Sequence, residues 1–113
     1  MKREQDHNVG RVMRFGAGAA YLRRRAKDHR SHGRLLEAVE LYRLALQQEE
    51  TPETEFDLAD TLHRMGCERE AADILYDLCA EKDVPRGVYY LLALTQRALG
   101  DTEAAVDALC HDL

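Results

Sequence analysis

One short pattern occurs three times along this chain and limits the folds that it can adopt. In each occurrence a glycine is followed five residues later by an alanine: Gly33 and Ala38, Gly66 and Ala71, Gly100 and Ala105. The glycines are 33 and 34 residues apart, and each lies between two stretches with helical apolar spacing. Glycine permits a chain reversal, and alanine lets two helices cross closely. The pattern therefore predicts three pairs of antiparallel helices, each pair joined by a glycine turn.

Length and composition agree with an all-α fold. The 113 residues are rich in Ala, Leu, Glu and Arg and include only two prolines, which favours helices. A chain of this length can bury one core without metal or disulfide, but it is too short for a barrel of eight strand–helix units. Thr51-Pro52-Glu53 has the residues of a helix start, and Val88–Leu94, although strand-like in composition, is predicted to be helical by the repeat register. The expected helices cover about residues 19–32, 35–49, 53–65, 68–82, 86–99 and 102–112.

The residues around the glycines resemble the tetratricopeptide repeat (TPR) family, whose first helix has the form W-x-x-L-G-x-x-Y and whose second helix carries A-x-x-x-F. The third repeat has Tyr89-x-x-Leu92-Ala93-x-x-Gln96 and then Ala105-x-x-x-Leu109. The second has Leu58-Ala59-x-x-Leu62 and then Ala71-x-x-x-Leu75, with Glu55 at the aromatic position. The first matches better in its second helix, Ala38-x-x-x-Tyr42-x-x-Ala45, than in its first helix, Leu22-x-x-Arg25-Ala26-x-x-His29.

The resemblance covers residues 19–113 and implies a right-handed superhelical solenoid of antiparallel helix pairs. Its repeats would span about residues 19–51, 52–85 and 86–113, with the last one incomplete. Residues 1–18 are predicted to be a separate basic segment, either flexible or an extension of the first helix. The last repeat would leave an under-covered apolar edge, which either meets another chain, such as a second copy, or belongs to a longer repeat protein. The residues of this edge are Val106, Leu109, Cys110 and Leu113.

In the TPR family, partner proteins bind the concave surface formed by the first helices. Carried over by register, this surface would present Arg23, Lys27, Arg30, Phe56, Asp60, His63, Tyr90, Leu94 and Arg97. These residues change from basic through acidic to aromatic and aliphatic, which suits a peptide with an acidic end, a basic middle and an apolar anchor. Each could instead be an ordinary solvated helix residue, and the aromatic Phe56 and Tyr90 are the favoured anchors. The leading prediction is therefore a non-enzymatic protein-interaction module, a scaffold or adaptor that binds a protein or peptide.

The charges are divided unequally along the chain. Residues 1–34 hold ten Lys or Arg against three acids, whereas residues 35–113 hold six against eighteen, which gives a net charge of −5. The basic third offers an alternative function, the binding of nucleic acid or another anionic surface. Its contacts would be Arg11, Arg14, Arg23, Arg24, Arg25, Lys27, Arg30 and Arg34. The acidic remainder argues against nucleic acid, because it would repel phosphate unless it faced away.

No motif in the sequence has the residues of a catalytic, cofactor or metal site. The three cysteines form no C-x-x-C pair, and a nucleophile would also need an adjacent base. His29 and His32 lack a convincing third metal ligand, and Gly16-x-Gly18 lacks the rest of a phosphate loop. We therefore expect no enzymatic activity, no cofactor and no metal. The charged start and the short apolar run predict neither a signal peptide nor a membrane span, so the expected location is cytoplasmic.

Overall fold

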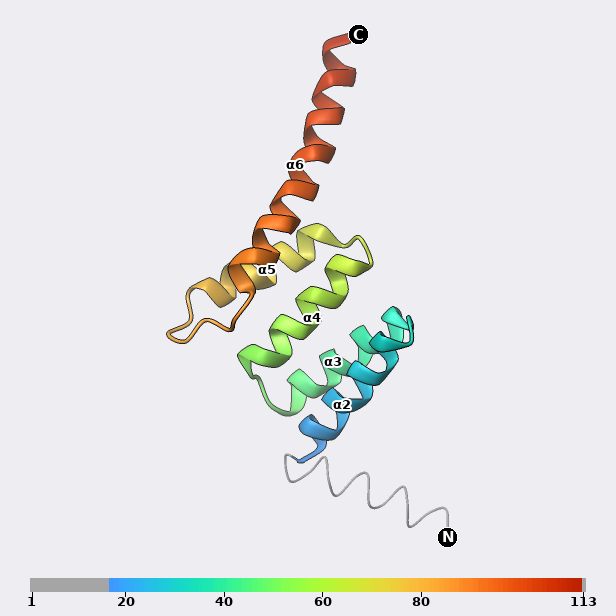
Figure 1. Ribbon diagram of the computed structural model, residues 1–113, viewed down its shortest axis with the longest axis vertical. Helices are drawn as coiled ribbons and strands as arrows, with labels where there is room; N and C mark the ends of the chain where they lie inside the picture. The colour runs from blue at the N-terminus through green and yellow to red at the C-terminus, as the bar shows by residue number, and fades with distance from the viewer. Residues whose placement is uncertain (1–16, 113) are drawn as a thin grey trace.

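The structure is a computed structural model that describes the backbone of residues 17–112 and the side chains of residues 18–101. Within this part the regular structure is entirely α-helical, which confirms the predicted all-α class. The helices are α2 (Ala17–Ser31), α3 (Leu35–Gln48), α4 (Pro52–Arg64), α5 (Glu68–Cys79) and α6 (Val88–Asp112), as drawn in Figure 1. None of the helices described is both long enough and apolar enough to cross a membrane.

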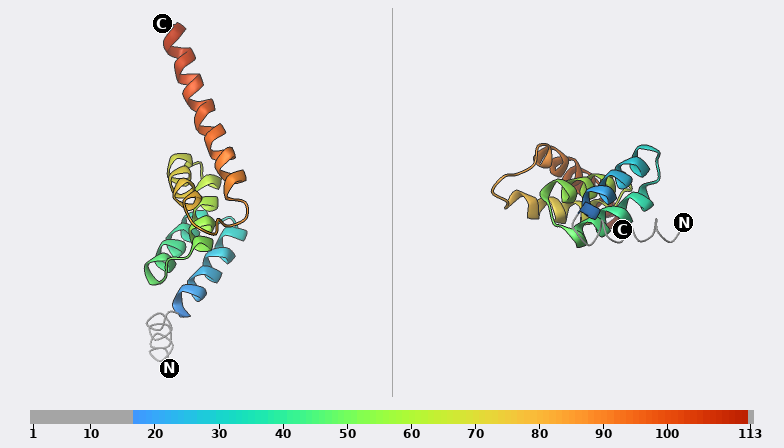
Figure 2. Two further views of the ribbon diagram at one scale, coloured as in Figure 1. Left: turned by 90° about the vertical axis from the view of Figure 1, so that its left-hand side faces the viewer. Right: turned by 90° about the horizontal axis from the view of Figure 1, so that it is seen from below.

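Each helix packs against the helix that follows it in the sequence. α2 packs on α3, α3 on α4, α4 on α5 and α5 on α6, and α4 also touches α6 (Figures 1 and 2). A continuous apolar core runs through these contacts because each helix buries one stripe of small and branched side chains. Its members include Ala26, Ala38, Tyr42, Ala59, Leu62, Ala71, Leu75, Leu78 and Val88.

The first two glycine turns form as predicted. Gly33 and Gly66 have φ angles of 80° and 86°, a left-handed conformation that other residues rarely adopt. The amide of Gly33 donates to the carbonyl of Arg30 (3.0 Å), and the amide of Arg34 donates to the carbonyl of His29 (2.9 Å). Gly66 and the residue after it make the same two bonds at the end of α4. The two pairs α2–α3 and α4–α5 therefore share one kind of turn.

The third predicted turn, at Gly100, is wrong. Residues 88–112 form one continuous helix, α6, instead of separate helices over 86–99 and 102–112. Glycine inside a helix costs only about 1 kcal/mol relative to alanine, whereas a break gives up several helical hydrogen bonds. In the first two pairs, packing of the second helix offsets the hydrogen bonds that the break gives up, because α4 covers α3 and α6 covers α5. No helix of the described part packs on residues 102–112, which extend away from the other helices in Figures 1 and 2.

Local signals set the start of α4, whereas the helical state of the first turns of α6 follows the repeat register. Thr51 caps α4 by accepting a hydrogen bond from the amide of Thr54 (3.2 Å), and Pro52 occupies the first helical position, as predicted. The strand-like run at 88–94 is helical, also as predicted. The loop before it ends at Gly87, whose φ angle of 93° brings the start of α6 close to α4.

Candidate functional site

Side chains of α2 and α4 join the first helices of the two helix pairs. Arg23 donates to Asp57 from Nη2 (3.2 Å) and Nε (3.4 Å). Arg30 Nη1 lies 3.3 Å from a carboxylate oxygen of Asp60 and 3.9 Å from one of Asp57. The predicted groove residues Arg23, Arg30 and Asp60 are therefore brought together on one surface.

Asp57 is a residue of this surface that lay outside the predicted groove set. It follows Arg23 by 34 residues, the length of one repeat, and this spacing was the signal that could have identified it. Only 8% of Asp57 is exposed, so its charge needs the two arginines that face it. The ion pairs of Asp57 thus hold α2 against α4.

Asp60 is the predicted acidic contact for the basic middle of a bound peptide, and its carboxylate is already engaged by described residues. Asp60 already receives Arg30 and also Arg64, whose Nη2 lies 3.3 Å away. A lysine or arginine of a partner would have to displace these cations. The charge of Asp60 is therefore compensated by described residues.

Tyr42 lies beneath this surface and is fully buried. The Cζ atom of Arg30 lies 6.0 Å from the centre of the Tyr42 ring, a cation–π distance. Its hydroxyl has no hydrogen-bond partner among the described residues. Burial, followed by the charge of Asp57, raises the pKa of Tyr42 to about 12, although Arg30 and Arg23 oppose the shift. The hydroxyl therefore stays protonated at neutral pH.

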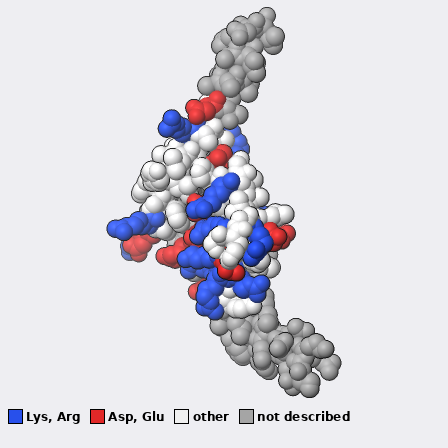
Figure 3. Space-filling model, turned by 45° about the vertical axis from the view of Figure 1, so that its right-hand side comes forward, with Lys and Arg blue, Asp and Glu red and all other residues white. Residues whose placement is uncertain are grey.

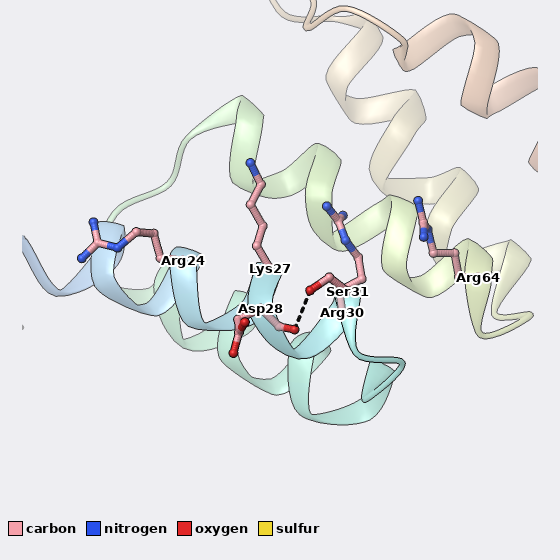
Figure 4. A pocket seen from close by; sticks show the side chains of 6 residues that line it. All are labelled: Arg24, Lys27, Asp28, Arg30, Ser31 and Arg64. Carbon is pink, nitrogen blue, oxygen red and sulfur yellow. Dashed lines mark hydrogen bonds between the residues drawn. The ribbon is translucent and has the colours of Figure 1, made fainter.

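A shallow, open hollow of about 570 Å³ lies beside the ion pairs. It is lined by Arg24, Lys27, Asp28, Arg30, Ser31 and Arg64 (Figure 4). In Figure 4, Lys27 and Arg30 from α2 and Arg64 from α4 extend toward the same side, whereas the carboxylate of Asp28 points the opposite way. Ser31 is held by a hydrogen bond from its hydroxyl to the carbonyl of Asp28 (2.8 Å). Cations thus dominate the open side of the hollow.

Two of these cations have no partner of their own. Among the described residues, no ion pair or hydrogen bond engages the side chain of Arg24 or Lys27, and both residues are exposed. They also line a second, smaller hollow of about 200 Å³ together with Arg23. Figure 3 shows Lys and Arg gathered, with some Asp and Glu between them, on the lower half of the described body. Arg24 and Lys27 are therefore the cations of this hollow whose charge no described residue compensates.

The other predicted groove residues do not join this cluster. His63 is hydrogen-bonded to Glu68 at the α4–α5 turn (Nδ1 to Oε1, 2.7 Å). Phe56 is half-buried and packs against the core. Gly87 lies close to its ring: a Cβ added at Gly87 would come within 3.2 Å of the Cζ atom of Phe56. Tyr90, by contrast, is 72% exposed on α6, where it stands with half-buried Leu94 and exposed Arg97. Of the two predicted aromatic anchors, Tyr90 is the accessible one.

The histidines and cysteines of the described part form no metal cluster. No three His, Cys, Asp or Glu residues there are placed to hold an ion. His29 accepts a hydrogen bond from Arg34 (2.8 Å), and the ring of His32 contacts Asp28. Cys67 and Cys79 are free thiols. Several sequence predictions lie outside the described residues or side chains: Arg11, Arg14, Gly16, Val106, Leu109, Cys110, Leu113 and most of the segment 1–18.

Comparison with known protein families, with curated proteins and with solved structures gives no significant match to this chain.

Proposed function

We propose that this chain is a non-enzymatic protein-interaction module, a TPR-like solenoid that binds an acidic segment of a partner protein across α2 and α4. The observation that carries the proposal is the pair of free cations, Arg24 and Lys27, at a hollow that Arg30 and Arg64 also line. The repeated pairs α2–α3 and α4–α5, with the same glycine turn, support the repeat architecture.

The arrangement of charges favours a negatively charged ligand. Arg23, Arg30 and Arg64 already have carboxylate partners, so their positive charge is largely compensated. Arg24 and Lys27 are not compensated, and a carboxylate in the hollow would pair with them while remaining close to water. Exposed pairs of this kind each contribute about 0.2–1 kcal/mol. Binding through them is therefore weak per contact, fast to form and sensitive to salt.

An apolar residue of the same partner would add affinity on α6. Because α4 contacts both α2 and α6, we expect a segment that leaves the hollow across α4 to continue to α6, which carries the exposed Tyr90. Exposed tyrosines are frequent anchors because they bury a large ring at a small cost in side-chain entropy. The proposed ligand is thus a segment with an acidic part and a separate apolar residue.

The test measures binding of a fluorescent acidic peptide, with a peptide in which every Glu is replaced by Gln as the control ligand. Lys27→Glu and Arg24→Glu should weaken binding of the acidic peptide by about tenfold together, and added salt should weaken it further. Matched control variants are Lys82→Glu and Arg86→Glu, which reverse charges on exposed residues of the α5–α6 loop. Equal binding of the two peptides, or an equal effect of the two pairs of variants, would contradict the proposal.

The same cations favour a second candidate, the binding of nucleic acid or another anionic surface. Arg24, Lys27, Arg30 and Arg64 could contact phosphates in the hollow. Asp57 and Asp60 lie beside them, and the net charge of −5 works against a polyanion. Retention on duplex DNA or single-stranded RNA at low salt would favour this candidate, and its absence would exclude it.

A further inference from the structure

The hollow between α2 and α4 presents more cationic groups than the two oxygens of one carboxylate can engage. Lys27 and Arg30 of α2 and Arg64 of α4 line it and extend toward the same side (Figure 4). Lys27 and Arg30 are three residues apart, which places them on one face of α2. A phosphate monoester carries three strong acceptor oxygens in place of two. Such a group can therefore contact cations from both helices at once.

The two arginines keep hydrogen-bond donors for a ligand although both have carboxylate partners. Arg30 contacts Asp57 and Asp60 through Nη1 (3.9 and 3.3 Å). Arg64 contacts Asp60 through Nε (3.4 Å) and Nη2 (3.3 Å). A guanidinium has five N–H donors, so Nε and Nη2 of Arg30 and Nη1 of Arg64 carry donors that these contacts do not use. Pairs of parallel N–H donors are the geometry in which arginine recognises phosphate.

The uncompensated charge of the hollow also matches a phosphate. Arg24 and Lys27 are its two cations whose charge no described residue compensates. A phosphorylated side chain has a charge of about −1.5 to −2 at pH 7, whereas a carboxylate compensates only one of the two cations. Asp28 also lines the hollow, but its carboxylate points the opposite way in Figure 4 and does not oppose an anion on the open side.

We infer that the acidic group bound in this hollow is a phosphorylated serine or threonine of the partner segment. This inference rests on the proposed function, because it specifies the chemistry of the same ligand. Lys27 and Arg24 neutralise the phosphate, and Arg30 and Arg64 donate to its oxygens from α2 and α4. Phosphorylation of the partner then controls its association with this chain.

The rest of the chain favours a single phosphate monoester over nucleic acid. A nucleic acid carries a row of phosphates, so it would extend beyond the hollow and pass over the neighbouring surface. Residues 35–113 hold eighteen acids against six Lys or Arg, and their charge opposes a long polyanion. A phosphorylated side chain concentrates its charge at one point and avoids most of this repulsion.

The test compares three fluorescent peptides that differ at one central position of the acidic peptide, which is Glu, Ser or phosphoserine. The phosphoserine peptide should bind about tenfold more tightly than the Glu peptide, and the Ser peptide should bind more weakly than both. Equal affinities of the phosphoserine and Glu peptides would overturn this inference and leave the proposed function standing. If none of the three peptides binds, both are overturned.

Arg64→Gln tests whether α4 takes part in recognising the phosphate. It removes donors for a third phosphate oxygen, whereas Arg24 and Lys27 can still pair with a carboxylate. Asp60 keeps Arg30 as its partner in this variant. The ratio of the phosphoserine affinity to the Glu affinity should therefore fall by about threefold or more.

Arg43→Gln is the matched control for this variant. The side chains of Arg43 and Arg64 are similarly exposed (50% and 54%), and Arg43 also pairs with one carboxylate, that of Glu70. Arg43 lies on α3 and does not line the hollow. Its substitution should leave the affinity ratio unchanged, and circular dichroism should give the same helix content for both variants. An equal ratio in the two variants would overturn the inference.

Competition distinguishes the possible sources of the phosphate. Inorganic phosphate and duplex DNA should each displace the phosphoserine peptide only at concentrations at least about tenfold above its Kd, because neither supplies the other contacts of the peptide. Displacement by inorganic phosphate at that Kd would indicate a site for free anions. Displacement by duplex DNA at that Kd would indicate a nucleic-acid site. Either result would overturn the inference.

Discussion

Replacing a repeated glycine by alanine should lower the free energy of unfolding at Gly33 and Gly66 and raise it at Gly100. Gly33 and Gly66 have φ angles of 80° and 86°, whereas Gly100 lies inside α6. At none of the three positions would an added Cβ come within 4 Å of a neighbouring group. Steric crowding therefore does not contribute, and the backbone conformation alone decides the change in the free energy of unfolding.

The magnitudes follow from two effects. A left-handed conformation costs an alanine about 1–2 kcal/mol. Alanine also restricts the unfolded chain, which stabilises the fold by about 0.4–1 kcal/mol. Gly33→Ala and Gly66→Ala should each lower the free energy of unfolding by about 1 kcal/mol, or Tm by about 4 °C. Gly100→Ala should raise the free energy of unfolding by about 0.5–1 kcal/mol, because both effects favour alanine inside a helix.

Urea unfolding followed by circular dichroism measures all three variants under one set of conditions. The protein is diluted until the unfolding midpoint no longer depends on concentration, so that association of copies does not contribute. A loss at Gly100 as large as those at Gly33 and Gly66 would refute the reasoning. It would mean that Gly100 adopts a left-handed turn and that α6 is divided into two helices.

Other substitutions test the buried charges and the polar groups near them. Tyr42→Phe removes a hydroxyl without a described partner, so the free energy of unfolding at neutral pH should stay within about 1 kcal/mol or increase. The pKa of Tyr42 is about 12 instead of the ordinary 10.0, so the fold should lose stability as the pH rises between these values, and Tyr42→Phe should abolish that loss in alkaline unfolding measurements. Burial and three neighbouring carboxylates raise the pKa of Glu55 above 4.5, so stability should fall as the pH rises just above that value. The Tm advantage of Glu55→Gln should therefore grow between about pH 4 and about pH 7. Asp57→Ala should cost about 1–2 kcal/mol in urea unfolding, whereas Arg24→Ala should change it by less than about 0.5 kcal/mol.

The sequence was sufficient for features that depend on local chemistry. Gly33 and Gly66 each take a positive φ angle that glycine alone adopts easily, and the turns form where the pattern predicts them. Arg30 and Asp60, which the sequence assigned to neighbouring repeats, lie 3.3 Å apart across α2 and α4. The use of these residues in binding stays a prediction.

Other features depend on contacts that the local pattern does not encode. Gly100 is followed five residues later by an alanine, as the first two glycines are. Whether the chain turns at Gly100 or continues as a helix depends on whether another helix covers residues 102–112. Phe56 is half-buried because Gly87 lets the start of α6 approach it. Neither effect is visible from helical periodicity, which reports the faces of a single helix and not what lies against them.

The cations of α2 that stabilise the fold differ from those proposed to bind a ligand, and this separation decides how the proposed ligand surface can be tested. Arg23 and Arg30 face Asp57, whose buried carboxylate would lose its compensation if either were removed, so their substitution alters the fold together with any site. Arg24 and Lys27 are exposed and lack described partners, so their charges can be reversed at little cost to the fold. A loss of acidic-peptide binding in Lys27→Glu, with an unchanged free energy of unfolding, therefore reports on the ligand contact itself.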